Sequence, residues 1–273
     1  MTDAIVQMLS YSFMVRAIVV GVLVSLCSAL LGVSLVLKRY SMIGDGLSHV
    51  GFGALAVATA LGLSPLKVTV PVVVIAAVLL LRVSENSKIK GDSAIGIIST
   101  ASLALGVLAI SVTSGLNTDL YNYLFGSILA MTKSDVYLSV VLSCCVLVAF
   151  VVFYNKIFAV TFDESFATAS GTSAAWYNML IAVLTAITIV LGMRMMGSLI
   201  ISALVVFPAI TAMRICKSFR KVTIVAAVLS VICFCIAVVL SYMYDLPTGA
   251  TLVAVHMCAL VIFEIIRKII SAN

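Results

Sequence analysis

The sequence reads FMVRAIVVGVLVSLCSALLGVSLVL over residues 13–37, and the basic pair Lys38-Arg39 follows directly. This apolar run, which contains Arg16 as its single charge, is long enough for a membrane-spanning helix, since such a helix takes about 20 apolar residues. The remainder of the 273-residue chain is similar: 64% of it is hydrophobic and 10% is charged, against roughly 25% charged in soluble domains. We therefore expect an all-α polytopic membrane protein, and the composition excludes a water-soluble globule.

Breaks that carry charged residues separate further apolar runs of similar length. Pro208 frees the carbonyl of Leu204 from its helical partner, so the run around it is expected to be kinked, broken or only partly spanning. The expected bundle has eight to nine transmembrane helices, and little chain remains for loops, so residues 1–273 are expected to form a single transmembrane domain. The candidate spans are 13–37, 43–63, 66–82, 93–113, 135–154, 173–192, 197–214, 222–243 and 249–266.

The basic residues indicate the orientation of the chain in the membrane. If successive breaks alternate between sides, twelve of the sixteen Lys and Arg residues fall on one side and four on the other. The richer side is expected to face the cytoplasm, because cytoplasmic loops carry the excess of positive charge. The net charge of +6 is thus explained by topology, and no nucleic-acid partner is expected.

Asp45 and both histidines of the chain, His49 and His256, fall inside candidate spans, where ionisable groups cost roughly 2.5–3.5 kcal/mol and usually have a function. Asp45 and His49 are four residues apart and share one helix face, and a carboxylate with an imidazole suits a divalent transition metal. His256 is expected at a similar depth, so the three side chains could hold one ion if their helices are neighbours. A structural interpretation stays open, in which Asp45 and His49 bind each other and His256 binds a backbone carbonyl.

The break at 155–172 has the pattern of a short surface helix on the cytoplasmic side. Phe162, Phe166 and Ala169 recur at helical spacing. Asp163 and Glu164 lie at its start, where the helix dipole favours acids. Gly171 is placed to end it. Exposed aromatic residues on such an element indicate either a docking site or an anchor at the membrane surface.

The chain lacks the GxxxxGK[ST] signature of a nucleotide-binding loop, so it is not expected to bind ATP by itself. Moving a cation uphill needs an energy source, and a partner that supplies it is therefore implied.

Four motifs, taken together and in order, resemble the permease family of zinc, manganese and iron ATP-binding-cassette importers over nearly the whole chain. They are LKRYSMIGDGLSH at 37–49, the Phe162-Asp163-Glu164 stretch with Ala169 and Gly171, GSLIISALVVFPAITA at 197–212, and LPTGA at 246–250.

The resemblance implies a multi-pass subunit of the cytoplasmic (inner) membrane that has no cofactor of its own and carries Mn, Zn or Fe as cargo. Its implied partners are a second permease copy or relative, a cytoplasmic ATP-binding subunit and an extracytoplasmic metal-binding protein. The family's coupling element matches 162–171, and its pathway ligands match Asp45 and His49, with His256 as a weaker match. Gly46 stands where the family more often has Ala.

Two other functions stay open at this point. A secondary carrier would move the metal without any ATPase subunit. An intramembrane hydrolase would use Asp45 and His49 to activate water, although the sequence has no HExxH helix and no convincing second catalytic Asp within a span.

Overall fold

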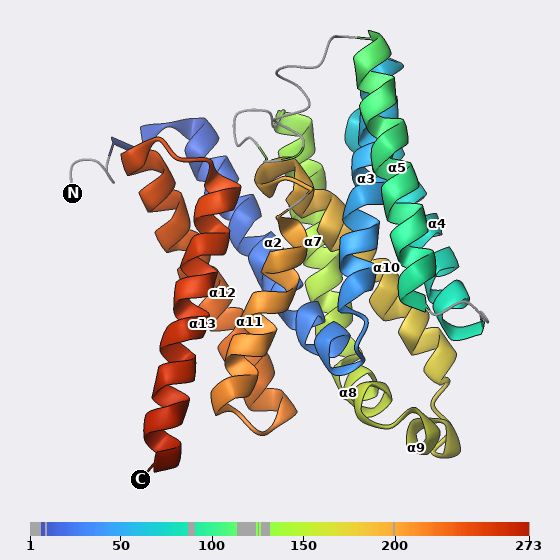
Figure 1. Ribbon diagram of the computed structural model, residues 1–273, viewed down its shortest axis with the longest axis vertical. Coiled ribbons are helices and arrows are strands. Elements are labelled where there is room, and N and C mark those ends of the chain that lie inside the picture. Colours follow the sequence, from blue (N-terminus) through green and yellow to red (C-terminus); the bar gives the residue numbers. More distant parts are fainter. Residues whose placement is uncertain are drawn as a thin grey trace.

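The computed structural model describes residues 7–8, 10–86, 91–113, 124, 126, 132–198 and 200–272, and these residues contain helices and connecting turns but no strand. The helices form an elongated bundle with the start of α2 toward one end (Figure 1). The C-terminus, α8 and α9 lie toward the other end. The helices are α2 (Ser12–Leu37), α3 (Ser41–Ala60), α4 (Pro65–Asn86), α5 (Gly91–Thr113), α7 (Lys133–Val152), α8 (Tyr154–Phe162), α9 (Glu164–Ala169), α10 (Ala174–Met196), α11 (Ile201–Ile215), α12 (Phe219–Tyr244) and α13 (Thr248–Ala272).

Each of the nine expected segments coincides with a helix, and seven of these helices are long and apolar enough to cross a membrane. The other two are α3 and α11. The 20 residues of α3 include Asp45, His49 and four glycines, which make the helix less apolar. The 15 residues of α11 extend only about 22 Å at 1.5 Å per residue, against about 30 Å of hydrocarbon. The chain is therefore a multi-pass membrane protein whose described residues contain seven candidate spans, and the expected count of eight to nine is not confirmed.

The helix α11 is short, as expected, but Pro208 is not the reason. Pro208 lies inside α11 and does not break it. The interruption comes before the helix instead, at Gly197, whose φ of 89° ends α10. Proline is tolerated within apolar helices because neighbouring helices and small local adjustments satisfy the freed backbone groups.

Two helices form the centre of the bundle. α2 and α10 are largely buried, whereas α5, α7 and α13 expose many apolar side chains. Helices α3, α4 and α5 pack together on one side of this centre, and α11, α12 and α13 pack together on the other (Figure 1). The outer apolar faces are those expected to contact lipid.

Backbone contact between α3 and α5 depends on two glycines. A Cβ atom added at Gly53 would lie 2.6 Å from the carbonyl oxygen of Ser102, and one added at Gly106 would lie 2.9 Å from the Cα of Gly53. Real side chains do not tolerate such distances, so only glycine permits this approach. The two helices are thereby held together along the face of α3 that bears the candidate metal ligands.

The segment between α7 and α10 is two helices rather than the single short helix expected. The chain is extended at Asp163, with φ −151° and ψ 100°, so α8 ends at Phe162 and α9 begins at Glu164. The Asp163 carboxylate accepts a hydrogen bond of 2.9 Å from the backbone N–H of Phe166, which caps α9. The acid that was expected within the helix therefore separates two helices.

Candidate functional site

Asp45 and His49 lie together on one face of α3, as their spacing predicts. The Nε2 atom of His49 is 3.7 Å from Oδ2 of Asp45, which is too long for a hydrogen bond. The Asp45 side chain is 41% exposed and that of His49 is 13% exposed. Within the described part of the chain, the buried Nδ1 atom of His49 has no hydrogen-bond partner. The structural interpretation, in which the two side chains satisfy each other, is therefore not supported.

The pair opens into a cavity of about 180 Å³ between α3 and α5. Met42 extends its wall on the α3 side, and Ser99 and Thr100 contribute hydroxyl groups from α5. The Thr100 hydroxyl already donates to the carbonyl of Gly96, at 2.8 Å. The Ser99 hydroxyl is buried and finds no partner among the described residues. The cavity thus presents a carboxylate, an imidazole and one unbonded hydroxyl.

The structure does not bring His256 to this cavity. His256 lies on α13, which packs against α11 and α12, whereas the main neighbours of α3 are α5, α4 and α10. Figure 1 shows α13 and α3 on opposite sides of the bundle. Across the described ranges, no three His, Cys, Asp or Glu side chains form a group that could hold one metal ion. The condition set for convergence of the three side chains, that their helices be neighbours, is therefore not met in this structure.

His256 is nevertheless an unusual residue. It is 1% exposed, and neither ring nitrogen has a hydrogen-bond partner in the part of the chain that the structure covers. The expected bond to a backbone carbonyl is thus not seen. Helix rise alone predicted the depth of His256, but which helices are neighbours depends on the packing of the whole bundle.

Sequence reasoning missed Ser99. A single serine in an apolar helix gives no signal of its own, because such hydroxyls commonly bond the carbonyl four residues earlier, as Thr100 does here. Only the close packing of α5 on α3 shows that Ser99 faces the same cavity as Asp45 and His49.

The aromatic residues of the segment between α7 and α10 have different surroundings. Phe166 is 68% exposed on α9. Phe162 is also exposed, but its ring lies 5.0 Å from that of Phe158 and 6.0 Å from that of Phe219, measured between centroids. Phe162 therefore joins an aromatic cluster between α8 and α12, and Phe166 is the aromatic residue that α9 presents outward.

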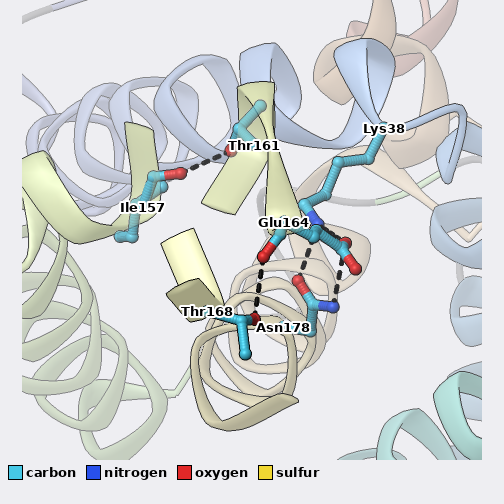
Figure 2. Close-up of polar contacts among 6 residues, drawn as sticks. All are labelled: Lys38, Ile157, Thr161, Glu164, Thr168 and Asn178. Carbon is cyan, nitrogen blue, oxygen red and sulfur yellow. Dashed lines mark hydrogen bonds and ion pairs between the residues drawn. The ribbon is translucent and has the colours of Figure 1, made fainter. Parts of the chain in front are cut away.

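The two acids of this segment bind groups within the chain. Asp163 caps α9, and the carboxylate of Glu164 accepts hydrogen bonds from the Lys38 ammonium and the Asn178 amide (Figure 2). Partial burial raises the pKa of Glu164, but its bonds to Lys38 and Asn178 outweigh this effect and leave the pKa below its ordinary value. Glu164 is thus held as a carboxylate at neutral pH.

The end of α9 agrees with the sequence-based expectation. Gly171 has φ 82°, and its N–H donates to the carbonyl of Thr168 while that of Thr172 donates to the carbonyl of Ala167. This pair of bonds is the Schellman arrangement that ends a helix at glycine. Ala169, the last residue of α9, is exposed beside it.

Comparisons with known proteins connect this geometry to a family. The profile of the ABC 3 transport family matches residues 10–267. The manganese transport system membrane protein MntC of Halalkalibacterium halodurans is 30% identical over 91% of this chain and 85% of its own. The high-affinity zinc uptake system membrane protein ZnuB of Haemophilus influenzae is 29% identical over 89% of this chain and 93% of its own. The solved structure of PsaBC from Streptococcus pneumoniae in complex with Fab superposes with a TM-score of 0.86 at 26% identity, covering 96% of this chain and 94% of that one.

Proposed function

Because the chain belongs to the ABC 3 transport family, we propose that it is the membrane permease subunit of an ATP-binding-cassette importer for a divalent transition metal, Mn, Zn or Fe. The metal would enter the cytoplasm by alternating access, driven by a separate ATPase subunit. The relatives named for manganese transport and zinc uptake support transport rather than catalysis.

The observation that carries this proposal is the Asp45–His49 pair beside its cavity. An ionisable pair in an apolar helix that lacks a mutual hydrogen bond is costly, and a cation in transit would satisfy both side chains. Two strong ligands and the neutral Ser99 hydroxyl make a sparse site. A sparse site suits transport, because the ion must leave as readily as it enters.

The assembly proposed for the chain follows the same reasoning. We place residues 1–273 as one transmembrane domain in the cytoplasmic (inner) membrane, paired with a second permease copy or relative. An extracytoplasmic metal-binding protein would deliver the ion. On the cytoplasmic side the ATPase would dock on the segment 162–171, with Phe166 as its main contact, because Asp163 and Glu164 already bind groups within the chain.

The proposal is tested by reconstituting the chain in lipid vesicles with and without the proposed ATPase subunit. Uptake of manganese and of zinc is measured with radioactive tracers. We expect uptake only when both the ATPase subunit and ATP are present. Uptake without the ATPase subunit would instead support the secondary carrier.

Changing Phe166 to Ser is expected to release the ATPase subunit. A buried aromatic anchor at an interface commonly contributes 2 kcal/mol or more, so affinity should fall about 30-fold or more. Co-purification of the two subunits in detergent measures the effect. Tyr244 is a matched control, since it is 66% exposed at the far end of α12, and Tyr244→Ser should leave co-purification unchanged. Equal retention of the ATPase by both variants would exclude Phe166 as the contact.

A further inference from the structure

The contact between α9 and the core of the bundle runs through one buried lysine. Lys38 caps the C-terminus of α2, and its side chain is only 5% exposed. Its ammonium donates to the Glu164 carboxylate, at the start of α9, and to the Asn178 side-chain oxygen at 2.7 Å, in α10. The Asn178 amide in turn donates to the same Glu164 oxygen at 3.1 Å. Figure 2 shows the three side chains converging from three helices.

A rigid turn connects Lys38 to the helix that bears the candidate metal ligands. Arg39 follows with φ 61°, a conformation that side chains other than glycine rarely adopt. The N–H of Tyr40 donates to the carbonyl of Leu35 at 2.8 Å, and that of Arg39 donates to the carbonyl of Val36 at 3.1 Å. These bonds fix the turn tightly, and α3 begins at the next residue, Ser41. Asp45 lies in the second turn of α3, so little flexible chain separates it from Lys38.

The network leaves few ways for α9 to move independently. If α9 shifts with Glu164, the Lys38 ammonium must follow or lose its charged partner while remaining buried. Losing a charged partner is unfavourable for a buried ammonium. If Lys38 follows, the fixed turn carries the displacement to the start of α3.

We propose that Lys38 is the positioning residue that transmits displacement of α9 to α3 and so couples ATPase movement to the Asp45–His49 pair. This inference rests on the function proposed above. It assigns to Lys38 no contact with the metal or with ATP. Its role is to make α3 move together with α9.

A second lysine provides a matched control. Lys156, on α8, donates to the Thr172 hydroxyl at 3.0 Å. Both residues of this contact belong to the segment between α7 and α10, so the contact joins parts of that segment and does not reach α2 or α3. Lys156→Met and Lys38→Met therefore each remove one lysine ammonium from the same end of the bundle. Only Lys38→Met removes the contact that leads to α3.

The test measures metal transported per ATP hydrolysed in vesicles that contain the full complex. In Lys38→Met we expect this ratio to fall about tenfold or more while ATP hydrolysis and subunit assembly persist. In Lys156→Met the ratio should stay within twofold of the unmodified complex. The exchange Lys38→Glu with Glu164→Lys restores an ion pair across the same gap, and it should recover much of the ratio.

Two results would overturn the inference. One is an unchanged ratio of metal transported to ATP hydrolysed in Lys38→Met. A parallel fall of transport and hydrolysis counts as this result, because it leaves the ratio unchanged and indicates a merely structural role. The other is an exchange variant that assembles but stays as uncoupled as Lys38→Met. If Lys38→Met does not assemble, the variant Glu164→Gln is used instead, because it removes the charge from the more exposed partner. An unchanged ratio in Glu164→Gln would also overturn the inference. Absence of ATP-dependent uptake in the unmodified complex would instead refute the proposed function.

Discussion

Replacing Asp45 with Asn is expected to reduce metal uptake by about 100-fold or more while the subunits still assemble. The substitution preserves shape but removes the negative charge, and a neutral amide attracts a divalent cation less strongly than a carboxylate does. His49→Ala should have a similar effect, since it removes the imidazole that lines the cavity. Tracer uptake into vesicles measures both, and co-purification with the ATPase subunit shows whether assembly is intact.

Two other residues that line the cavity provide a control variant and a variant with a smaller expected loss of uptake. Thr100→Val removes a hydroxyl that already donates to Gly96, so uptake should remain within about twofold of the unmodified protein. Ser99→Ala removes the unbonded hydroxyl and should lower uptake less than Asp45→Asn does. Uptake in Asp45→Asn equal to that in Thr100→Val would remove Asp45 from the pathway.

Replacing Arg194 with Met is expected to lower the unfolding temperature more than the substitution of any exposed residue does. Arg194 on α10 donates to the Asp135 carboxylate on α7 at 2.9 Å, and both side chains are largely buried. Breaking a buried pair by removing one partner typically costs 3–5 kcal/mol, because the remaining charge is uncompensated. At about 2–4 °C per kcal/mol for a chain of this order of size, the unfolding temperature in detergent should fall by roughly 10 °C.

Two comparisons test this explanation. Arg16 is a partly exposed arginine that donates to Ser12 within its own helix, so Arg16→Met should shift the unfolding temperature by less than about 2 °C. Asp135 also completes the capping box of α7 with Thr132, and Asn in its place still offers an oxygen to that cap. The double variant Arg194→Met with Asp135→Asn should therefore be more stable than Arg194→Met alone. A double variant less stable than Arg194→Met would contradict the buried-charge explanation.

Much of the architecture could be predicted because it depends on local composition. Nine apolar runs became nine helices, and the short α11 was singled out in advance, although Pro208 was the wrong reason. The end of α9 at Gly171 followed from the need for a positive φ. The break at Asp163 was missed, because an acid fits the first turn of a helix as well as the residue that caps it.

The candidate site could be predicted only in part. The proximity of Asp45 and His49 follows from helical spacing, whereas the distance of His256 from them follows from which helices pack together. Ser99 and Lys38 had no local signal of their roles. Their importance arises from contacts with other helices, and Lys38 and Glu164 are 126 positions apart in the chain.

The sequence by itself determined that the chain is helical, crosses a membrane several times and pairs a carboxylate with an imidazole on one helix face. Only the tertiary structure decided which faces meet: α3 against α5, Lys38 against Glu164 and Asn178, and Arg194 against Asp135. The physical reason is that lipid and protein interior are both apolar. A helix that is hydrophobic all round carries little pattern to show which side faces its neighbours, so the partners are selected by shape and by the few polar groups that must be satisfied.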